Sequence, residues 1–305
     1  MHLLLFALAV EVVAPQAAFV EPFAAARDRA GNLYVCEHQG QKIMKVDPAG
    51  LVSRFAGTGA PGFGGDNGPA DAAAFRDPHG IVIGPDNRMY VADTENHRVR
   101  RIDLRTGTIT TIAGTGRRGF SGDGGPAVNA EFDGIYGIAL DGRGRNLYVA
   151  DLGNRRIRRI ALRSGIVTTV AGNGTKGVPA DGAAAAAGPL VDPRAVAADD
   201  KGNVYILERG GNALRLLDAR GRIRTLIGPE GATPPMKGPK HLCLDRDGGI
   251  VIADAENHLI RRYANGALST IDTGPLRRPH GVYVDSSGTL YICDSDNHRV
   301  LKLRR

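Results

Sequence analysis

The sequence predicts an all-β fold, a six-bladed β-propeller whose blades are four-stranded antiparallel sheets. Two observations carry this prediction. Glycine supplies 42 of the 305 residues, about twice the average share, which is typical of short strands joined by many tight turns. One block of residues also recurs six times along the chain, and a recurring unit that holds four strands is the pattern of a propeller blade.

The repeated block starts at an acidic anchor residue, and its clearest copy is Asp93-Thr-Glu-Asn-His-Arg-Val. A turn of the form Asp-x-x-Asn that bonds its own backbone is needed in every blade, whereas a catalytic residue is needed only once. We therefore expect the anchors to be structural. They are Glu37, Asp93, Asp151, Glu208, Asp254 and Asp294.

Each unit divides into four expected strands. The first follows a proline that lies fifteen residues before five of the anchors. A turn of the form Asp-x-x-Gly separates it from the second strand, which spans Met89 to Asp93 in the second unit. The third strand covers Arg98 to Ile102 and the fourth covers Thr108 to Ala113. Period-two alternation and β-branched residues favour strands over helices throughout.

The two ends of the chain complete the last blade. The sixth copy ends at Arg305, directly after its third strand, and residues 10–14 match the fourth-strand pattern of the other units. We predict that residues 10–14 close the ring as the outer strand of the last blade, so that residues 1–305 form one domain. Residues 1–9 are interpreted either as the remnant of a secretion signal or as an extension. A start further upstream would favour a secreted or periplasmic protein, and otherwise a cytoplasmic protein is expected.

Composition restricts the partners. Lys and Arg total 39 against 32 Asp and Glu, a formal charge of +7, which mildly favours anionic partners. The three cysteines have neither the even count of a disulfide scaffold nor paired C-x-x-C spacing. No apolar run reaches the length of about 18 residues that a membrane-spanning helix needs. We expect a monomer with no membrane span.

The blocks Asp-x-x-Asn-His-Arg-Val, Pro-His-Gly-Ile and Gly-x-Leu-Tyr-Val-Ala-Asp resemble the NHL repeat, which builds six-bladed propellers. The resemblance covers nearly the whole chain. It implies the fold rather than the function, because propellers carry unrelated activities on one scaffold. The fold is also similar to that of the peptidylglycine amidating lyase, in which metal-binding histidines come from the inner strands of several blades.

The residue after each repeat proline begins the innermost strand and is expected at the mouth of the central channel. His79 and His280 match the placement of the lyase histidines. Arg194 occupies the blade where a third, evenly spaced histidine would be needed, and catalytic zinc usually has three protein ligands. Together with His241, one position further along, the candidate ligand-binding residues are Phe23, His79, Tyr136, Arg194, Lys240, His241 and His280.

Three functions are compatible with this set, and the sequence leaves open whether the protein is an enzyme. The favoured one is a ligand- or protein-binding module whose cationic channel mouth binds a small anionic ligand, a peptide or a glycan. The alternative is a metal-assisted lyase or hydrolase, in which His79 and His280 bind one divalent transition metal, Tyr136 acts as acid or base and Arg194 holds an anionic group. The third is a purely structural scaffold, which predicts a channel filled by side chains.

Three long Gly- and Asp-rich insertions follow the first three units, whereas the last three units have short connections. We expect this difference to give an asymmetric groove on the face around the channel mouth. Asp66, Asp123 and Asp181 in the insertions could bind Ca²⁺ through carboxylate and backbone oxygens, and the alternative is that they hold turns. Nucleic-acid binding is disfavoured, because the chain has no Trp and its Arg-Arg pairs are spread around the ring.

Overall fold

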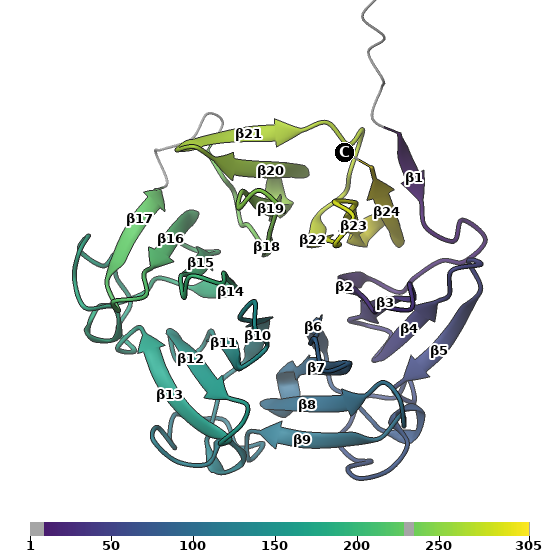
Figure 1. Ribbon diagram of the computed structural model, residues 1–305, viewed down its shortest axis with the longest axis horizontal. Coiled ribbons are helices and arrows are strands. Elements are labelled where there is room, and N and C mark those ends of the chain that lie inside the picture. Colours follow the sequence, from purple (N-terminus) through teal and green to yellow (C-terminus); the bar gives the residue numbers. More distant parts are fainter. Residues whose placement is uncertain (1–8, 229–234, 305) are drawn as a thin grey trace, which may run out of the picture.

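The structure, a computed structural model, describes residues 9–228 and 235–304. Its strands form six four-stranded antiparallel sheets that surround a central channel (Figure 1). Within each blade the strands run in order from the channel to the rim, so that the innermost strand is hydrogen bonded on one side only. The predicted six-bladed propeller is therefore confirmed.

The blades follow the repeat. Blade 1 contains β2 (Pro22–Arg27), β3 (Leu33–Glu37), β4 (Lys42–Val46) and β5 (Val52–Ala56), and blade 2 contains β6 (Pro78–Ile83), β7 (Arg88–Asp93), β8 (Arg98–Asp103) and β9 (Ile109–Ala113). Blade 3 contains β10 (Ile135–Leu140), β11 (Asn146–Asp151), β12 (Arg156–Ala161) and β13 (Ile166–Ala171), and blade 4 contains β14 (Pro193–Ala198), β15 (Val204–Glu208), β16 (Ala213–Leu217) and β17 (Ile223–Ile227). Blade 5 contains β18 (His241–Leu244), β19 (Ile250–Asp254), β20 (Leu259–Ala264) and β21 (Ala267–Ile271), and blade 6 contains β22 (Pro279–Val284), β23 (Leu290–Asp294), β24 (Arg299–Leu303) and β1 (Val10–Val12).

The connections within the described residues contain short 3₁₀ helices. They are η1 (Ala70–Ala72), η2 (Thr94–Asn96), η3 (Ala127–Asn129), η4 (Ala185–Ala187), η5 (Ala255–Asn257) and η6 (Ser295–Asn297). In this part of the chain no helix is long and apolar enough to cross a membrane.

The ring closes as predicted, between the two ends of the chain. Strand β1 pairs antiparallel with β24, and Val10 lies opposite Leu303. The backbone N–H of Val13 extends the pairing by donating to the carbonyl of Val300 at 2.8 Å. Most of residues 1–9, the predicted signal remnant or extension, lie outside the described residues.

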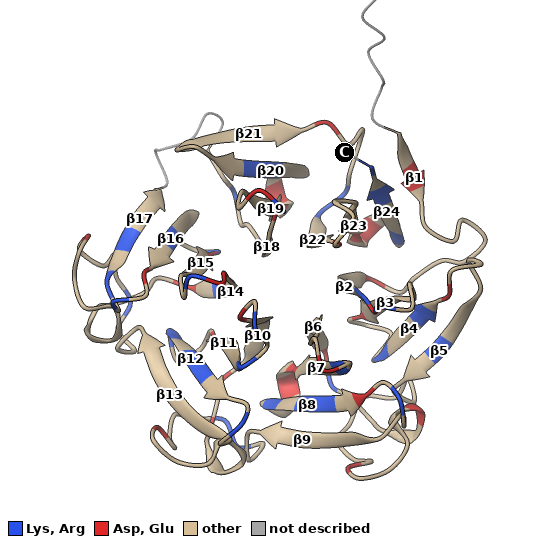
Figure 2. Cartoon of the chain, in the orientation of Figure 1, with Lys and Arg blue, Asp and Glu red and all other residues tan. Residues whose placement is uncertain are grey.

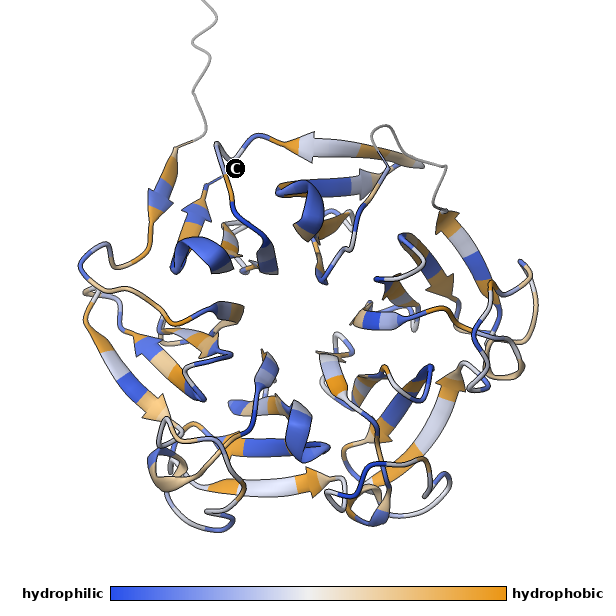
Figure 3. Cartoon of the chain, turned by 180° about the vertical axis from the view of Figure 1, so that it is seen from behind, coloured by the Kyte–Doolittle hydropathy of each residue, from blue (hydrophilic) through white to orange (hydrophobic). Residues whose placement is uncertain are grey.

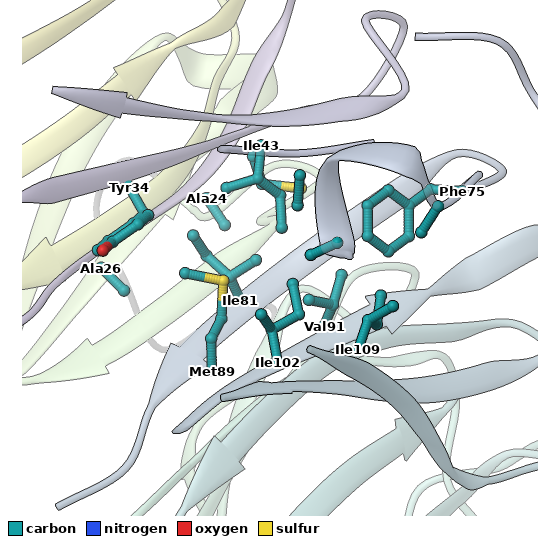
Figure 4. Close-up of a cluster of buried hydrophobic side chains, with 14 residues drawn as sticks. Ala24, Ala26, Tyr34, Ile43, Phe75, Ile81, Met89, Val91, Ile102 and Ile109 are labelled. Atoms are coloured by element: carbon teal, nitrogen blue, oxygen red, sulfur yellow. The ribbon is translucent and has the colours of Figure 1, made fainter. Parts of the chain in front are cut away.

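The hydrophobic core consists of six clusters, each of which lies between two neighbouring blades. Figure 3 shows the alternation of apolar and polar residues along the strands that makes this packing possible. In the cluster between blades 1 and 2, Ile43 of one sheet faces Met89 and Ile102 of the other (Figure 4). Burying side chains of this size stabilises by about 1.5–3 kcal/mol each, so a blade depends on its neighbours for its core.

The six anchor carboxylates are buried, and the four aspartates among them hold the turn that follows them, which agrees with the structural interpretation. Asp93 accepts hydrogen bonds from the backbone N–H of Arg76 at 2.8 Å and from the amide of Asn96 at 2.9 Å. The turn is η2, and it ends at His97 in the left-handed conformation, with φ of 51°. The bond to Arg76, seventeen residues earlier, shows that the anchor also ties down the loop between blades.

The third strands carry a second buried layer of charge (Figure 2). Arg100 is completely buried, and its Nη atoms lie 3.3 Å from the anchor Asp93 and 2.9 Å from Asp66 of the long insertion. The same arrangement recurs at Arg158, which pairs with Asp123 at 2.9 Å. In each case the neighbouring residue of the Arg-Arg pair is only half-buried, as strand alternation predicts.

These pairings show whether the aspartates of the long insertions are free to bind calcium or hold their loops. Asp66 and Asp123 accept hydrogen bonds from buried arginines, and Asp181 accepts one from the backbone N–H of Thr225 at 2.7 Å. Moreover, the described part of the chain places no group of three or more His, Cys, Asp or Glu side chains where they could hold a metal ion. The residues present therefore do not fit a calcium site, and the alternative, that these aspartates hold their loops, accounts for the geometry.

The long insertions turn outward to the rim. The N–H of Asn67 donates to the carbonyl of Ile109 on β9, and Gly124 and Gly182 make the equivalent bonds to Val167 and Ile223 on the outer strands of the next blades. None of the residues that line the channel mouth comes from an insertion. The insertions therefore do not line the channel mouth, because they pair with the outer edges of neighbouring sheets, and an asymmetric groove on that face stays a prediction.

Candidate functional site

A local irregularity of the inner strands presents the candidate residues at the channel mouth. In blade 2, Pro78 pairs with Asp93 but Gly80 pairs with Ala92, so His79 is an extra residue in a β-bulge. The same shift falls at the equivalent place in blades 1, 3, 4 and 6. A bulge changes the direction of a side chain relative to the regular alternation of the strand. In the other four blades the residue at the bulge is Phe23, Tyr136, Arg194 or His280.

The predicted residues meet in one pocket. It is lined by Phe23, His79, Tyr136, Gly137, Arg194, Lys240, His241 and His280, which are the seven candidates and one neighbouring glycine. The free space at its base is about 10 Å³, close to the minimum that one water molecule needs. Side chains therefore fill most of the mouth, as the scaffold alternative predicts, and leave room for one small group.

Stacked rings form one side of the pocket. The ring of Phe23 lies between those of His38 and His280, with centroid distances of 4.3 and 4.0 Å and interplanar angles below 10° (8° and 9°). His79 meets His38 edge-on at 4.6 Å and Tyr136 at 4.5 Å. His38 was missed in the sequence. It directly follows the anchor Glu37, and the residue after an anchor reaches the next inner strand elsewhere too, since Ser295 Oγ donates to Pro22 O at 2.6 Å.

The histidines of the mouth are neutral. The Nδ1–H of His79 donates to the carbonyl of Asp77 at 2.8 Å, and that of His280 to the carbonyl of Arg278 at 3.0 Å, which leaves each Nε2 as a hydrogen-bond acceptor. Burial, followed by the charge of Arg194, lowers the pKa of His280 to about 2 and that of His79 well below its ordinary value. Positive charge in the pocket therefore comes from arginine and lysine.

Arg194 is the buried cation of the site. Only 6% of it is exposed, and its guanidinium lies 3.9 Å from the centre of the Tyr136 ring. No carboxylate of the described residues lies within ion-pair distance, 4.0 Å, of this guanidinium. Burial lowers the pKa of Arg194 to about 10, which reflects a charge that the fold holds without a full counter-charge.

A second cation lies near it. The side chain of Lys240 is 9% exposed and its Nζ is 3.5 Å from Glu256, a carboxylate that also pairs with Arg278 at 3.4 Å. Burial and then the charge of Arg194 lower the pKa of Lys240. Lys240 and Arg278 thus share the single negative charge of Glu256. Together with Arg194 they leave the pocket with an excess of positive charge.

The donor set does not fit the metal site that the lyase resemblance implied. The ring of Phe23 packs against both His79 and His280, and Arg194, a cation, takes the place of a third ligand. The described residues offer no group of three ligating side chains here or elsewhere. The assignment of Tyr136 and Arg194 as catalytic residues stays a prediction.

Elemental mass spectrometry of protein purified without a His tag or chelator tests this conclusion. We expect no near-stoichiometric Zn, Cu, Mn or Fe in the wild type, and no difference in a His79→Ala/His280→Ala double variant. Stoichiometric metal that is lost in the double variant would contradict it and restore the enzyme alternative.

The fold and repeat pattern agree with known sequences. The model of the NHL repeat matches residues 75–102 and 276–303, which fall in blades 2 and 6. The chain contains NHL repeats within a six-bladed propeller. Among solved structures, a streptogramin B lyase superposes with a TM-score of 0.63 over 97% of both chains, at 13% sequence identity, a likeness that shows the shared propeller fold.

Two curated relatives place the NHL repeats in larger proteins. NHL repeat-containing protein 2 of Gallus gallus is 31% identical over 146 residues, which is 45% of this chain and 20% of the relative. SUPPRESSOR OF QUENCHING 1 of Arabidopsis thaliana, a chloroplastic protein, is 26% identical over 235 residues, 69% of this chain and 22% of the relative. The region that matches this chain therefore spans about a fifth of the length of each of these two proteins.

Proposed function

We propose that this NHL propeller is a binding module whose channel mouth binds one anionic group, a carboxylate or a phosphate, between Arg194 and Lys240. The observation that carries the proposal is the buried guanidinium of Arg194, which packs on a tyrosine ring and has no carboxylate of the described residues within 4.0 Å, while Asp192 acts on it only from further away. An unpaired buried charge costs several kcal/mol. An anion at this place would supply the missing partner and gain charge-assisted hydrogen bonds.

The size of the pocket limits the ligand. Free space of about 10 Å³ has room for about one oxygen atom, so a carboxylate or phosphate would place one oxygen in the pocket, and the rest of a peptide or glycan would lie across the rim. Arg209 and Arg278 lie close enough to lower the pKa of Lys240, although each is paired with a carboxylate, Asp192 and Glu256 respectively, and the chain as a whole carries a formal charge of +7. Long-range attraction of this kind raises the association rate of an acidic partner.

A titration with matched probes tests the proposal. Acetate and acetamide have nearly the same shape and differ in charge, so we expect acetate, and also inorganic phosphate, to shift the NMR signals of Gly137 and Arg194 saturably, and acetamide to leave them unchanged. Affinity should stay constant between about pH 5.5 and 8, because the lowered pKa values of His79 and His280 keep both rings neutral in that range.

Two results would contradict this account. Equal shifts with acetamide would show that charge plays no part. A steep rise in acetate affinity below about pH 6.5 would show that protonated histidines carry the positive charge in place of Arg194 and Lys240.

A further inference from the structure

The opposite mouth of the channel contains a second cavity, of different chemistry. Its volume is about 210 Å³, and all six inner strands contribute to its wall. Apart from His241, Tyr283 and the thiol of Cys243, the lining side chains are aliphatic. Leu140, Leu244 and Val284, at the ends of β10, β18 and β22, are only half-buried there. We call this cavity the apolar funnel.

A collar of small residues separates the funnel from the cationic mouth. A Cβ atom added to Gly137 would lie 2.6 Å from Cα of Ala195, and one added to Gly281 would lie 2.3 Å from the carbonyl oxygen of Phe23. The inner strands thus approach one another too closely for larger side chains at this level. Two residues after the start of the inner strands of blades 1, 2, 3, 4 and 6, the chain has Ala24, Gly80, Gly137, Ala195 and Gly281.

Blade 5 departs from this rule with His241. The imidazole stands at the collar position and lines both the cationic mouth and the apolar funnel. No requirement of the repeat explains it, because the five other blades close with Ala or Gly. A large polar side chain therefore borders an otherwise apolar cavity at its narrow end.

The hydrogen bond of the His241 ring indicates which of its two nitrogens carries the proton. Nδ1 accepts a long hydrogen bond from the backbone N–H of Val282, at 3.5 Å, and the ring is neutral because burial and the charge of Arg194 lower its pKa to about 4. The proton of a neutral ring with Nδ1 as acceptor is on Nε2. Within the described residues Nε2 has no hydrogen-bond partner, so His241 offers one N–H donor.

We propose that the apolar funnel binds an uncharged molecule of about the size of a benzene ring that carries one hydrogen-bond acceptor, with Nε2–H of His241 as the donor. The size follows from the volume of 210 Å³, because an apolar cavity of about 150 Å³ already binds benzene. The apolar wall favours a hydrocarbon body, and the single donor favours a carbonyl or ether oxygen. This site lies on the other side of the collar from the proposed anion site and shares only His241 with it.

Acetophenone and ethylbenzene are suitable probes, since they differ by one carbonyl oxygen. In a titration of methyl-labelled protein, we expect acetophenone to shift the methyl signals of Leu140, Leu244 and Val284 saturably and to bind about three- to tenfold more tightly than ethylbenzene. In His241→Ala the two affinities should become equal. The wild-type ratio alone tests the proposal if that variant does not fold.

A second pair of variants locates the site. Leu140→Gln places a polar group in the funnel and should weaken both probes at least about tenfold, whereas Leu51→Gln, at a residue that is 68% exposed outside the funnel, should leave them unchanged. The proposal is overturned if the funnel methyls do not shift up to the solubility limit, if both probes bind the wild type equally, or if Leu51→Gln weakens binding as much as Leu140→Gln.

Discussion

Replacing Arg158 with methionine is expected to lower the free energy of unfolding by about 3–5 kcal/mol. The guanidinium is completely buried and lies 2.9 Å from Asp123 and 3.4 Å from the anchor Asp151. Its removal leaves the anchor carboxylate buried without its cation. Chemical denaturation at pH 7, monitored by circular dichroism, measures the loss.

The pH dependence of this loss gives an internal control. Burial raises the pKa of Asp151 to about 6 in the wild type, and loss of the cation should raise it further, since a nearby positive charge favours the ionised form. The folded variant then takes up its proton at higher pH than the wild type. The difference in stability should therefore be largest above about pH 7 and shrink as the pH falls through 6. A loss that does not change with pH would contradict the ion-pair explanation.

We expect the opposite effect on stability when a second buried arginine is replaced, in the variant Arg194→Met. Arg194 has no carboxylate within 4.0 Å among the described residues, and the fold lowers its pKa, so its charge destabilises the free protein. We expect the unfolding free energy of Arg194→Met to equal or exceed that of the wild type. A loss similar to that of Arg158→Met would show that Arg194 is structural, and the anion proposal would fail.

The same variant should lose the anion site. Removing the buried guanidinium of Arg194 is expected to weaken acetate and phosphate binding at least about 100-fold, because a charge-assisted pair in a water-poor site contributes several kcal/mol. Arg105→Met, at an exposed arginine in the turn between β8 and β9, serves as the control and should bind both anions like the wild type. Equal weakening in the two variants would indicate a general charge effect.

The fold could be predicted from the sequence because every blade needs the same local structures. Alternating apolar strands and a buried acidic anchor are required in all six blades, the bulge of the inner strand recurs in five and the Asp-x-x-Asn turn in four, so the sequence repeats itself. Even the ring closure followed, since residues 10–14 copy the pattern of an outer strand and the last unit lacks one. The structure pairs Val10 with Leu303 as expected.

The residues that line the site could be predicted, but the charges around them could not. All seven candidates line one pocket, because the repeat places the residue after each proline at the same height of the channel. His38 was missed, because the residue after the anchor differs in every copy. That no carboxylate of the described residues lies within 4.0 Å of Arg194 could not be predicted, since it depends on how the acidic side chains nearby are placed by packing. The role of Asp66 was hidden for the same reason, as Arg100 is brought to it by packing.

The central claim is that the channel mouth holds an anion against Arg194, and anomalous diffraction from crystals soaked in sodium bromide tests it most directly. Bromide is a monatomic anion of suitable size for a site with about 10 Å³ of free space. We predict an anomalous peak between the guanidinium of Arg194 and Nζ of Lys240, and no such peak in crystals of Arg194→Met. Bromide at exposed arginines of the surface but none at the channel mouth would contradict the account.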